Sequence, residues 1–449
     1  MRLLLLSNTT GYQANAFREA AERVGVPLTL ATDRCHVLED PWGDQAIPVK
    51  FREAQESAQL LVEKSAELQF TGIVAIGDAP TLTAALAAER LREAGRTRMS
   101  VLHQGVPHEA EAVPCFHPPA AVEACQNKWL ARELFKGAGL QVPWYKRVPA
   151  DEDPRELVRD VPFPCVLKPL GLSGSRGVIR ANVGSEFVEA FHRIGELLRD
   201  INYPTQGQQE ALNGARGENQ WIQIEGYIPG REFALEGIVT DGVLKPLALF
   251  EKPDPLEGPY FEETIYVTPS RLGYSVQMAV VATTQRAIIA LGLTNGPIHA
   301  EMRLNDAGVW MLEIAARPIG GLCAKALRFG RERMPLEELI VRHAMGEDIS
   351  GLEREDSASG VMMIPIPQGG FYEGVKGVEQ AQRVPGVESV DITAKLQQKL
   401  VPLPEGASYL GFIFARGNSA LMVEEALRQA HGCLRFQISA EIPVVHDRR

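Results

Sequence analysis

The sequence lacks the features that mark membrane, secreted and nucleic-acid-binding proteins. No apolar run approaches the roughly 18 residues that a membrane-spanning helix needs, and the leucines at positions 3–6 give way to polar residues too soon for a signal peptide. The six cysteines are scattered and form no CxxC pair, so reduced thiols in a cytoplasmic protein are the simplest explanation. The net charge of −11 argues against binding to nucleic acid or to an anionic membrane surface.

Two common nucleotide-binding motifs are also missing. The chain contains neither the dinucleotide fingerprint GxGxxG nor a GxxxxGK[ST] phosphate loop, and it has no internal repeat or low-complexity segment. At 449 residues, with 45% hydrophobic residues, it is too long for a single ordinary core and is composed like a globular protein. We therefore expect about three domains that mix α/β and α+β architecture.

The first hundred residues alternate between predicted strands and predicted helices. This order predicts a small parallel sheet with helices on both faces. The predicted strands are Leu3–Leu6, Leu28–Ala31, Gly72–Ile76 and Met99–Leu102, and the predicted helices are Ala14–Val24, Arg52–Glu67 and Pro80–Glu93.

Polar loops follow two of these strands. The segment Ser7–Gly11 could line a ligand-binding crevice at the carboxyl end of its strand, although an ordinary turn explains it as well. Asp78 is expected to cap the helix that follows it and is alternatively a substrate contact.

The strongest functional signal is a predicted β-hairpin. Ile298–Leu304 and Val309–Ile314 are alternating runs around a turn rich in Asn, Asp and Gly. If Ala307 is the centre of the turn, Glu301 lies directly opposite Glu313 on one face. The same register pairs Leu304 with Trp310, Met302 with Leu312 and Ala300 with Ile314 on a continuous apolar face, which is why the hydrophobic pattern favours it.

Two carboxylates that face each other across neighbouring strands repel and need compensation. Magnesium suits this position, because it prefers oxygen ligands and is commonly held by one or two carboxylates plus substrate phosphates. The alternative is an exposed hairpin whose glutamates are solvated, with Arg303 nearby. The hairpin alone does not decide between the two.

Two further segments have a composition that suits phosphate groups. A buried strand delivers Lys168 to a loop of glycines and serines, in which backbone N–H groups, hydroxyls and a lysine charge could all reach an anion. Arg317–Gly321 is expected to open a helix over Leu322–Phe329 and to offer a second anion-binding site. Lys128 lies in the middle of a helix predicted over Pro118–Gly139 and by itself reads as a solvated side chain.

Taken in chain order, these motifs resemble those of a known family. Lys128 on its helix is followed by VLKP with Lys168, SGSRG, EGYIPGREF, HAEMR and LEIAARPIGG. The ordered set is similar to that of the ATP-grasp superfamily, and within it to carboxylate–amine ligases such as L-amino acid ligases and carnosine synthase. The resemblance spans nearly the whole chain and implies an ATP-grasp fold. It implies a Rossmann-like pre-ATP-grasp domain (residues 1–108), an ATP-grasp domain (109–350) and a C-terminal α+β domain (351–449), whose default role is packing or support for a lid.

The resemblance also implies roles for the residues that match the family's motifs. Those implied to bind ATP are Lys128 and Lys168 at the phosphates, Ser173, Gly174, Ser175 and Gly177 in the loop over the phosphates, Glu225, Tyr227 and Ile228 at the adenine, and Glu232 at the ribose. Those implied to hold magnesium are Glu301 and Glu313. Those implied to act on the substrates are Arg317, which steadies the phosphorylated intermediate, Glu263, which faces the substrate amine, Tyr266, and the glycines Gly320 and Gly321.

The sequence departs from the family pattern at two positions. Ala315 replaces the asparagine that usually follows the second metal glutamate at this spacing, which puts two-metal geometry in doubt. Tyr266 stands where similar ligases often carry histidine, so the choice of substrate does not transfer.

The resemblance implies ATP-dependent ligation of a carboxylate to an amine through an acylphosphate, with release of ADP and phosphate. The expected product is a dipeptide or similar amide, and the expected cofactors are ATP and Mg²⁺, with Mn²⁺ possible. Expected partners are small molecules, without nucleic acid or membrane, and a homodimer is possible. The alternatives are an ATP-grasp ligase acting on a non-amino-acid carboxylate and a degenerate nucleotide-binding regulatory protein, which the loss at Ala315 would suit.

Overall fold

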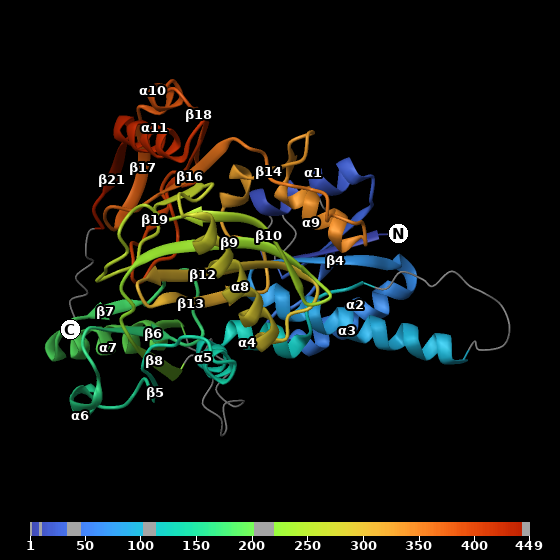
Figure 1. Ribbon diagram of the computed structural model, residues 1–449, viewed down its shortest axis with the longest axis horizontal. Coiled ribbons are helices and arrows are strands. Elements are labelled where there is room, and N and C mark those ends of the chain that lie inside the picture. The colour runs from blue at the N-terminus through green and yellow to red at the C-terminus, as the bar shows by residue number, and fades with distance from the viewer. Residues whose placement is uncertain (1, 9–10, 34–45, 102–113, 202–219, 442–449) are drawn as a thin grey trace, which may run out of the picture.

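The structure is a computed structural model that describes residues 2–8, 11–33, 46–101, 114–201 and 220–441. Figure 1 shows an N-terminal unit at one end of the molecule, a small sheet with α6 and α7 at the other, and a large central sheet between them. Within the described part of the chain, helices fall short of the length and apolar character that crossing a membrane would require.

The N-terminal unit is the small parallel sheet that the sequence predicts. Its strand order is β3-β2-β1-β4, and each neighbouring pair is parallel. Leu3 and Leu5 of β1 pack into one core while Leu4 and Leu6 pack into another, so both faces of the sheet are covered. The elements are β1 (Arg2–Ser7), α1 (Tyr12–Val24), β2 (Leu28–Thr32), β3 (Ala46–Pro48), α2 (Ala54–Leu68), β4 (Phe70–Ile76) and α3 (Asp78–Val101).

One predicted strand of this unit is wrong. The helix α3 passes Gly95 and continues to Val101, where the sequence pattern predicted a strand over Met99–Leu102; Leu102 itself lies outside the described residues. The stretch before Gly95 is rich in Ala, Leu, Glu and Arg, which are strong helix formers. Their summed preference outweighs the cost of about 1 kcal/mol that one glycine imposes.

A small antiparallel sheet follows, with the order β5-β8-β6-β7. The helix α7 covers one face of it through Phe187, Phe191 and Ile194. The elements of this region are α4 (Pro119–Gln126), α5 (Lys128–Gly137), β5 (Tyr145–Pro149), α6 (Pro154–Leu157), η2 (Val158–Asp160), β6 (Cys165–Pro169), β7 (Ile179–Ala181), α7 (Gly184–Ile201) and β8 (Trp221–Gly226).

The single helix predicted over Pro118–Gly139 is two helices. Asn127 has extended backbone angles, and its side chain accepts a hydrogen bond from the N–H of Leu130 at 3.0 Å, so it caps a new helix. Lys128 therefore occupies the first position of α5 rather than the middle of a longer helix. The break turns the start of α5 toward the cavity described below.

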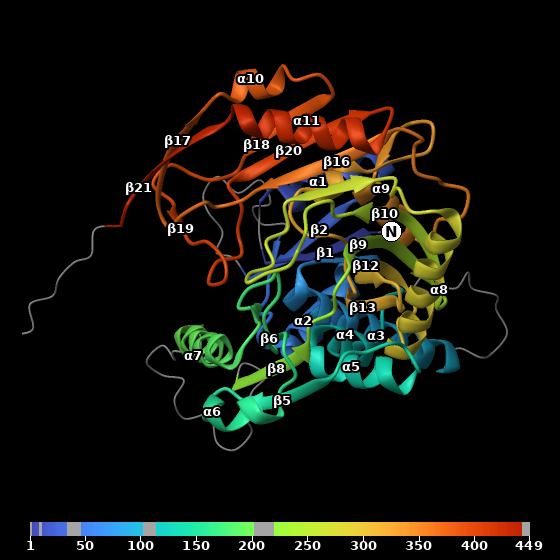
Figure 2. The same cartoon turned by 60° about the vertical axis from the view of Figure 1, so that its left-hand side comes forward.

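The central sheet has eight strands in the order β13-β12-β9-β10-β11-β16-β20-β18. It runs without interruption from the predicted ATP-grasp domain into the predicted C-terminal domain, because β11 pairs with β16 through four residues on each strand. Figure 2 shows the last three strands lying under α11. The elements are β9 (Arg231–Thr240), β10 (Val243–Glu251), β11 (Ile265–Thr268), α8 (Tyr274–Leu291), β12 (Gly296–Asn305), β13 (Gly308–Ala315), β16 (Ala358–Ile364), β18 (Val387–Ile392), β20 (Gly411–Gly417) and α11 (Ala420–Cys433).

Shorter elements complete the chain. The helix predicted over Leu322–Phe329 is wrong: a single 3-10 turn, η4 (Cys323–Ala326), is followed by a short strand, so the Arg317–Gly321 segment opens no α-helix. The remaining elements are β14 (Arg328–Phe329), β15 (Met334–Pro335), α9 (Leu336–Ala344), β17 (Gly370–Lys376), α10 (Val378–Gln382), β19 (Lys399–Leu400) and β21 (Arg435–Ser439).

The predicted hairpin is β12 and β13, and its register is right at the acidic pair but wrong beyond it. Glu301 lies opposite Glu313, as predicted, and Ala300 lies opposite Ile314. A β-bulge after Glu301 leaves Leu312 as the extra residue, so Met302 faces Met311 and Leu304 faces Val309, instead of Leu312 and Trp310. The bulge turns Leu312 and Glu313 to the same side, and both line the cavity.

We expect Gly360 to be needed where α11 packs on the central sheet. A Cβ atom at Gly360 would lie 2.8 Å from the carbonyl oxygen of Tyr266 and 2.8 Å from Val423. Gly360→Ala should therefore lower the free energy of unfolding by about 1–3 kcal/mol, as overpacking does. Gly432→Ala is the matched control, because nothing lies within 4 Å of its Cβ position. Urea denaturation midpoints would compare the two, and equal midpoints would contradict the packing argument.

Candidate active site

A cavity opens between the small sheet and the central sheet, and it collects nearly all the site residues predicted from the sequence. Gly177 alone of that set does not line it. The predicted residues in its wall are Lys128, Lys168, Ser173, Gly174, Ser175, Glu225, Tyr227, Ile228, Glu232, Glu263, Tyr266, Glu301, Glu313, Arg317, Gly320 and Gly321. The roles implied for these residues stay predictions, but their convergence into one cavity is a finding.

The C-terminal part of the chain contributes to the same wall. Met363, Ala407 and Tyr409 line the cavity, although the sequence pattern showed no functional cluster in this region. Burial raises the pKa of the Tyr409 phenol well above its usual value, so the phenol stays neutral. No local motif marks these residues, since each belongs to a strand or a loop whose position depends on the continuous central sheet.

The glycine- and serine-rich loop after Lys168 is held against the C-terminal part. The N–H of Gly177 donates to the carbonyl of Pro404 at 2.8 Å, and the guanidinium of Arg176 donates to the carbonyl of Glu405 at 2.7 Å. Arg193 of α7 adds an ion pair to the Glu405 carboxylate at 2.5 Å. We call residues 402–407 the latch segment, because they hold residues 173–177 over one side of the cavity.

Glu225 joins the small sheet to the rest of the site. Its carboxylate, whose side chain is 3% exposed, accepts hydrogen bonds from Lys168 at 2.6 Å and from Arg132 at 2.9 Å. Burial alone would raise the pKa of Glu225, but the charges of Arg132 and Lys168 outweigh it and lower the pKa to about 2. Glu225 is therefore ionised and fixes the position of Lys168.

Arg132 was missed by sequence reasoning. It lies on the buried face of α5, and besides Glu225 it donates to the carbonyls of Met311 at 2.7 Å and Leu312 at 3.2 Å. Those carbonyls belong to the β-bulge, so Arg132 satisfies the backbone groups that the bulge leaves without ladder partners. A lone arginine in an amphipathic helix gives no signal for this role.

Arg317 and Asp78 join the N-terminal unit to the cavity. Their side chains pair at 2.5 Å, and Asp78 also interacts with the hydroxyl of Ser173 in the glycine- and serine-rich loop after Lys168. Burial would raise the pKa of Asp78, but the Arg317 guanidinium outweighs it and lowers the pKa. Asp78 is the first helical residue of α3, one position after that of an N-cap, and its carboxylate engages Arg317 and Ser173, so the predicted capping role stays a prediction.

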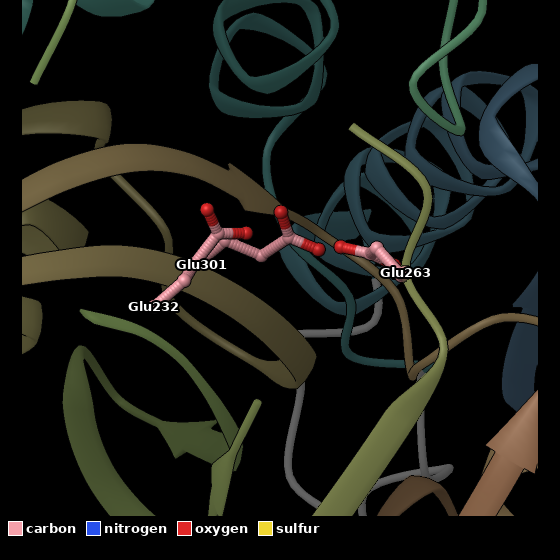
Figure 3. A group of neighbouring side chains, drawn as sticks. All are labelled: Glu232, Glu263 and Glu301. Atoms are coloured by element: carbon pink, nitrogen blue, oxygen red, sulfur yellow. The ribbon is translucent and has the colours of Figure 1, made fainter. Parts of the chain in front are cut away.

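Three carboxylates gather on the opposite wall. Glu232 and Glu301 extend from the central sheet, and Glu263 reaches toward them from the loop before β11 (Figure 3). One oxygen from each lies within 4.8 Å of the others. We call Glu232, Glu263 and Glu301 the acidic cluster.

A buried lysine compensates the acidic cluster. Lys252 follows β10, and its ammonium donates to Glu232 at 2.8 Å, donates to Glu263, and lies 3.5 Å from Glu301. Burial would lower the pKa of Lys252, but the carboxylates of Glu232, Glu263 and Glu301 outweigh it and raise the pKa well above its usual value. Sequence reasoning missed Lys252, because one lysine before a proline-rich loop reads as a solvated residue.

The individual acids of this wall differ in their preference for a proton. Burial and the nearby charge of Glu301 raise the pKa of Glu263 to about 7, although Lys252 counters part of the shift. Burial alone would raise the pKa of Glu301, but Lys252 and His299 together lower it. Glu301 is therefore the ionised member, and Glu263 is the one that can exchange a proton near neutral pH.

His299 links Glu301 to the loop that contains the glycine pair. Its Nδ1 bonds to Glu236, which lies directly across from it on β9, and its Nε2 lies 3.1 Å from Glu301. Burial would lower the pKa of His299, but Glu236 outweighs it and raises the pKa to about 10. The other carboxylate oxygen of Glu236 accepts the N–H of Ile319 at 3.3 Å, so the chain of contacts continues to the Arg317–Gly321 loop.

The two predicted metal ligands, Glu301 and Glu313, have carboxylate oxygen atoms available to coordinate an ion. Among the described residues, no hydrogen bond or ion pair engages the carboxylate of Glu313, which lies opposite Glu301 and faces the cavity. Both contacts made by Glu301 use its Oε1 atom. Hard oxygen atoms on two opposed side chains suit Mg²⁺, so the residues fit the predicted ion.

Two parts of the chain match known protein families. Residues 161–326 match the family described as an ATP-grasp domain, and residues 362–439 match the one described as L-amino acid ligase C-terminal domain 2. The crystal structure of an L-amino acid ligase from Bacillus licheniformis superimposes with a TM-score of 0.77 over 98% of this chain and 99% of that one, at 24% identity. That likeness is one of fold.

Sequence relatives cover a smaller part of the chain. Alanine–anticapsin ligase of Bacillus subtilis is 32% identical over 208 residues, which are 44% of this chain and 43% of that protein. Carnosine synthase 1 of Mus musculus is 27% identical over 219 residues, which are 46% of this chain and 25% of that protein. The alignments thus span less than half of each relative. The chain therefore has an ATP-grasp fold, in which residues 161–326 match an ATP-grasp domain and residues 362–439 match the C-terminal domain 2 of L-amino acid ligases.

Proposed function

We propose that the protein is an ADP-forming ligase that uses ATP to join a carboxylate to an amine, with amino acids as substrates and a dipeptide or similar amide as product. The observation that carries the proposal is one cavity that contains three things together: a lysine and glycine loop suited to phosphates, an opposed carboxylate pair suited to a divalent ion, and a buried acid suited to an amine. The relative named alanine–anticapsin ligase supports amino acids as the substrate class.

The phosphate end of the cavity supplies positive charge where phosphoryl transfer requires it. Lys128, Lys168 and Arg317 surround the loop at residues 173–175, and Glu225 and Asp78 fix two of these cations in place. Burial lowers the pKa of Lys128, and the negative charge of Glu313 offsets part of that shift. Transfer of the γ-phosphoryl group to a substrate carboxylate spreads negative charge over oxygen atoms, and fixed cations stabilise that charge. Magnesium held by Glu301 and Glu313 would supply further neutralisation of the phosphate oxygens.

The acid end of the cavity suits the second substrate. A pKa of about 7 lets Glu263 hold an ammonium group as a carboxylate or take up its proton near neutral pH. The free amine then attacks the acylphosphate carbon, the amide bond forms, and phosphate leaves. Tyr266, which donates its hydroxyl hydrogen bond to Glu263 at 2.8 Å, holds the carboxylate toward the cavity.

The nucleoside end of the cavity is formed by the segment that follows β8. Tyr227, Ile228 and Leu312 line it, so an adenine ring would lie between the end of β8 and the β-bulge. The resemblance implies that Glu232 binds the ribose, but Lys252 and Arg303 already engage its two oxygens at 2.8 and 2.9 Å. A ribose hydroxyl would therefore share an oxygen that is already hydrogen-bonded.

Location and assembly belong to the same proposal. Cysteines 115, 125, 165, 323 and 433 are free thiols, which is typical of a reducing compartment, so we propose a cytoplasmic protein that acts on small molecules. The possibility of a homodimer stays a prediction that sedimentation would test.

The substrate class is tested by looking for the product. Incubation with ATP, Mg²⁺ and amino acids, singly and in pairs, should yield condensation products detectable by mass spectrometry, with one ADP formed for each amide. If product forms only from carboxylates other than amino acids, the proposed amino acid substrates are wrong and the enzyme acts on another class of carboxylate. Tight ATP binding without product from any mixture would favour a regulatory nucleotide-binding protein instead.

Removal of the Glu313 carboxylate, a proposed magnesium ligand, should stop the reaction. Glu313→Gln keeps the shape of the side chain but loses its charge, so amine-dependent phosphate release should fall on the order of 100-fold or more, as expected when several kcal/mol of charge stabilisation are lost. Asp306→Asn in the exposed turn of the same hairpin is the control and should retain activity. Near-normal turnover by the Glu313 variant would show that the metal assignment is wrong.

Weakening the latch should admit water to the acylphosphate. Glu405→Ala removes a partly exposed ion pair with Arg193, and such pairs contribute up to about 1 kcal/mol, so hydrolysis without amide formation should rise about two- to fivefold. The readout is the ratio of phosphate to amide product. Glu441→Ala, which removes an exposed pair with Lys399 elsewhere in the C-terminal part, is the control. An unchanged ratio for the Glu405 variant would contradict a role in excluding water.

A further inference from the structure

The acidic cluster has the composition of a divalent cation site. Glu232, Glu263 and Glu301 each bring a carboxylate oxygen into one small region, and a divalent ion with three such ligands would be strongly held. The cluster is also close to the opposed pair of Glu301 and Glu313, because Glu301 belongs to both. The site could in principle hold a second ion at the cluster.

The contacts of Lys252 argue against a second ion. Its side chain is 3% exposed, and its ammonium lies 2.8 Å from the Glu232 oxygen, also bonds Glu263, and lies 3.5 Å from Glu301. A divalent ion would need the same oxygen atoms at roughly 2.0–2.6 Å. The ammonium and such an ion would therefore compete for one position.

The other oxygen atoms of the cluster are largely engaged as well. Glu232 accepts from Arg303 at 2.9 Å with its second oxygen, and Glu263 accepts from Tyr266 at 2.8 Å with its second oxygen. Within the described residues, no hydrogen bond reaches the Oε2 atom of Glu301, because His299 bonds to Oε1 and the ammonium of Lys252 also lies nearest to Oε1. The oxygen that remains available thus belongs to the residue that Glu313 faces.

We propose that Lys252 is a resident cation that fills the acidic cluster, so that this site takes its divalent ion at Glu313 and the remaining oxygen of Glu301 alone. Glu232 and Glu263 are then not metal ligands. Lys252 holds Glu263 and Glu301 at a fixed separation, which places the acid that faces the amine beside the carboxylate that faces the phosphates. This inference rests on the proposed function, because it assumes that the divalent ion binds together with a nucleotide.

The test counts Mn²⁺ ions by electron paramagnetic resonance of the free ion, with saturating ADP and no other substrate. The wild-type protein should bind a single Mn²⁺. Glu313→Gln should weaken it by about 10- to 100-fold, whereas Glu263→Gln should leave its affinity within about threefold, because only the first loses a ligand. Equal weakening by both variants would overturn the proposal. A second Mn²⁺ on the wild-type protein that Glu263→Gln removes would do the same.

A second variant tests the resident cation itself. Lys252→Met removes the ammonium and should create a new Mn²⁺ site that is occupied without nucleotide and disappears when Glu263→Gln is added. Lys245→Met, on the strand β10 that precedes Lys252 but paired with Glu353 outside the cavity, should create none. A folded Lys252→Met protein that gains no ion would overturn the proposal, and if that variant does not fold, the Glu263→Gln result decides. Neither measurement requires amide formation, so failure of the proposed reaction and failure of this inference are separable.

Discussion

The neutralisation of buried charge is the constraint on which the rest of this structure depends. Glu225, Glu232 and Glu301 line the cavity with side chains that are only 3%, 8% and 16% exposed, and a buried carboxylate without a partner costs several kcal/mol. Their cations come from other parts of the chain: Arg132 of α5 pairs with Glu225, Arg303 of β12 pairs with Glu232, and Lys252 after β10 pairs with Glu232 and lies 3.5 Å from Glu301. The charged groups therefore tie together elements that are far apart in the sequence.

The same pairs position the groups that we propose to act on substrates. Glu225 fixes Lys168, Asp78 fixes Arg317, and His299 fixes Glu301, so each proposed functional side chain is held by an opposite charge behind it. Preorganised charges of this kind act without reorganisation when a reaction develops charge, which is the main way that proteins catalyse phosphoryl transfer. The N-terminal unit contributes Asp78 and the C-terminal part contributes Tyr409, so no single domain contains the cavity.

Much of the wall could be predicted from the sequence, because local pattern is enough for it. The alternating residues of the hairpin place Glu301 opposite Glu313, and a lysine at a strand end before a glycine-rich loop marks Lys168. What local pattern cannot supply is a partner from a distant segment. Arg132 and Lys252 are single basic residues with no motif, and only the fold shows that each lies against buried acids. The β-bulge was missed because Trp310, Met311 and Leu312 are all apolar, so either register buries hydrophobic side chains.

The continuity of the central sheet limits how the cavity can open. Moving the C-terminal part aside would break the backbone hydrogen bonds between β11 and β16, where four residues of each strand are paired. The small sheet has no strand in common with the central one, and its connection beyond β8 runs through the segment that ends in Pro229 and Gly230. Entry of a nucleotide is therefore expected to move the small sheet and α7 rather than the C-terminal part of the central sheet.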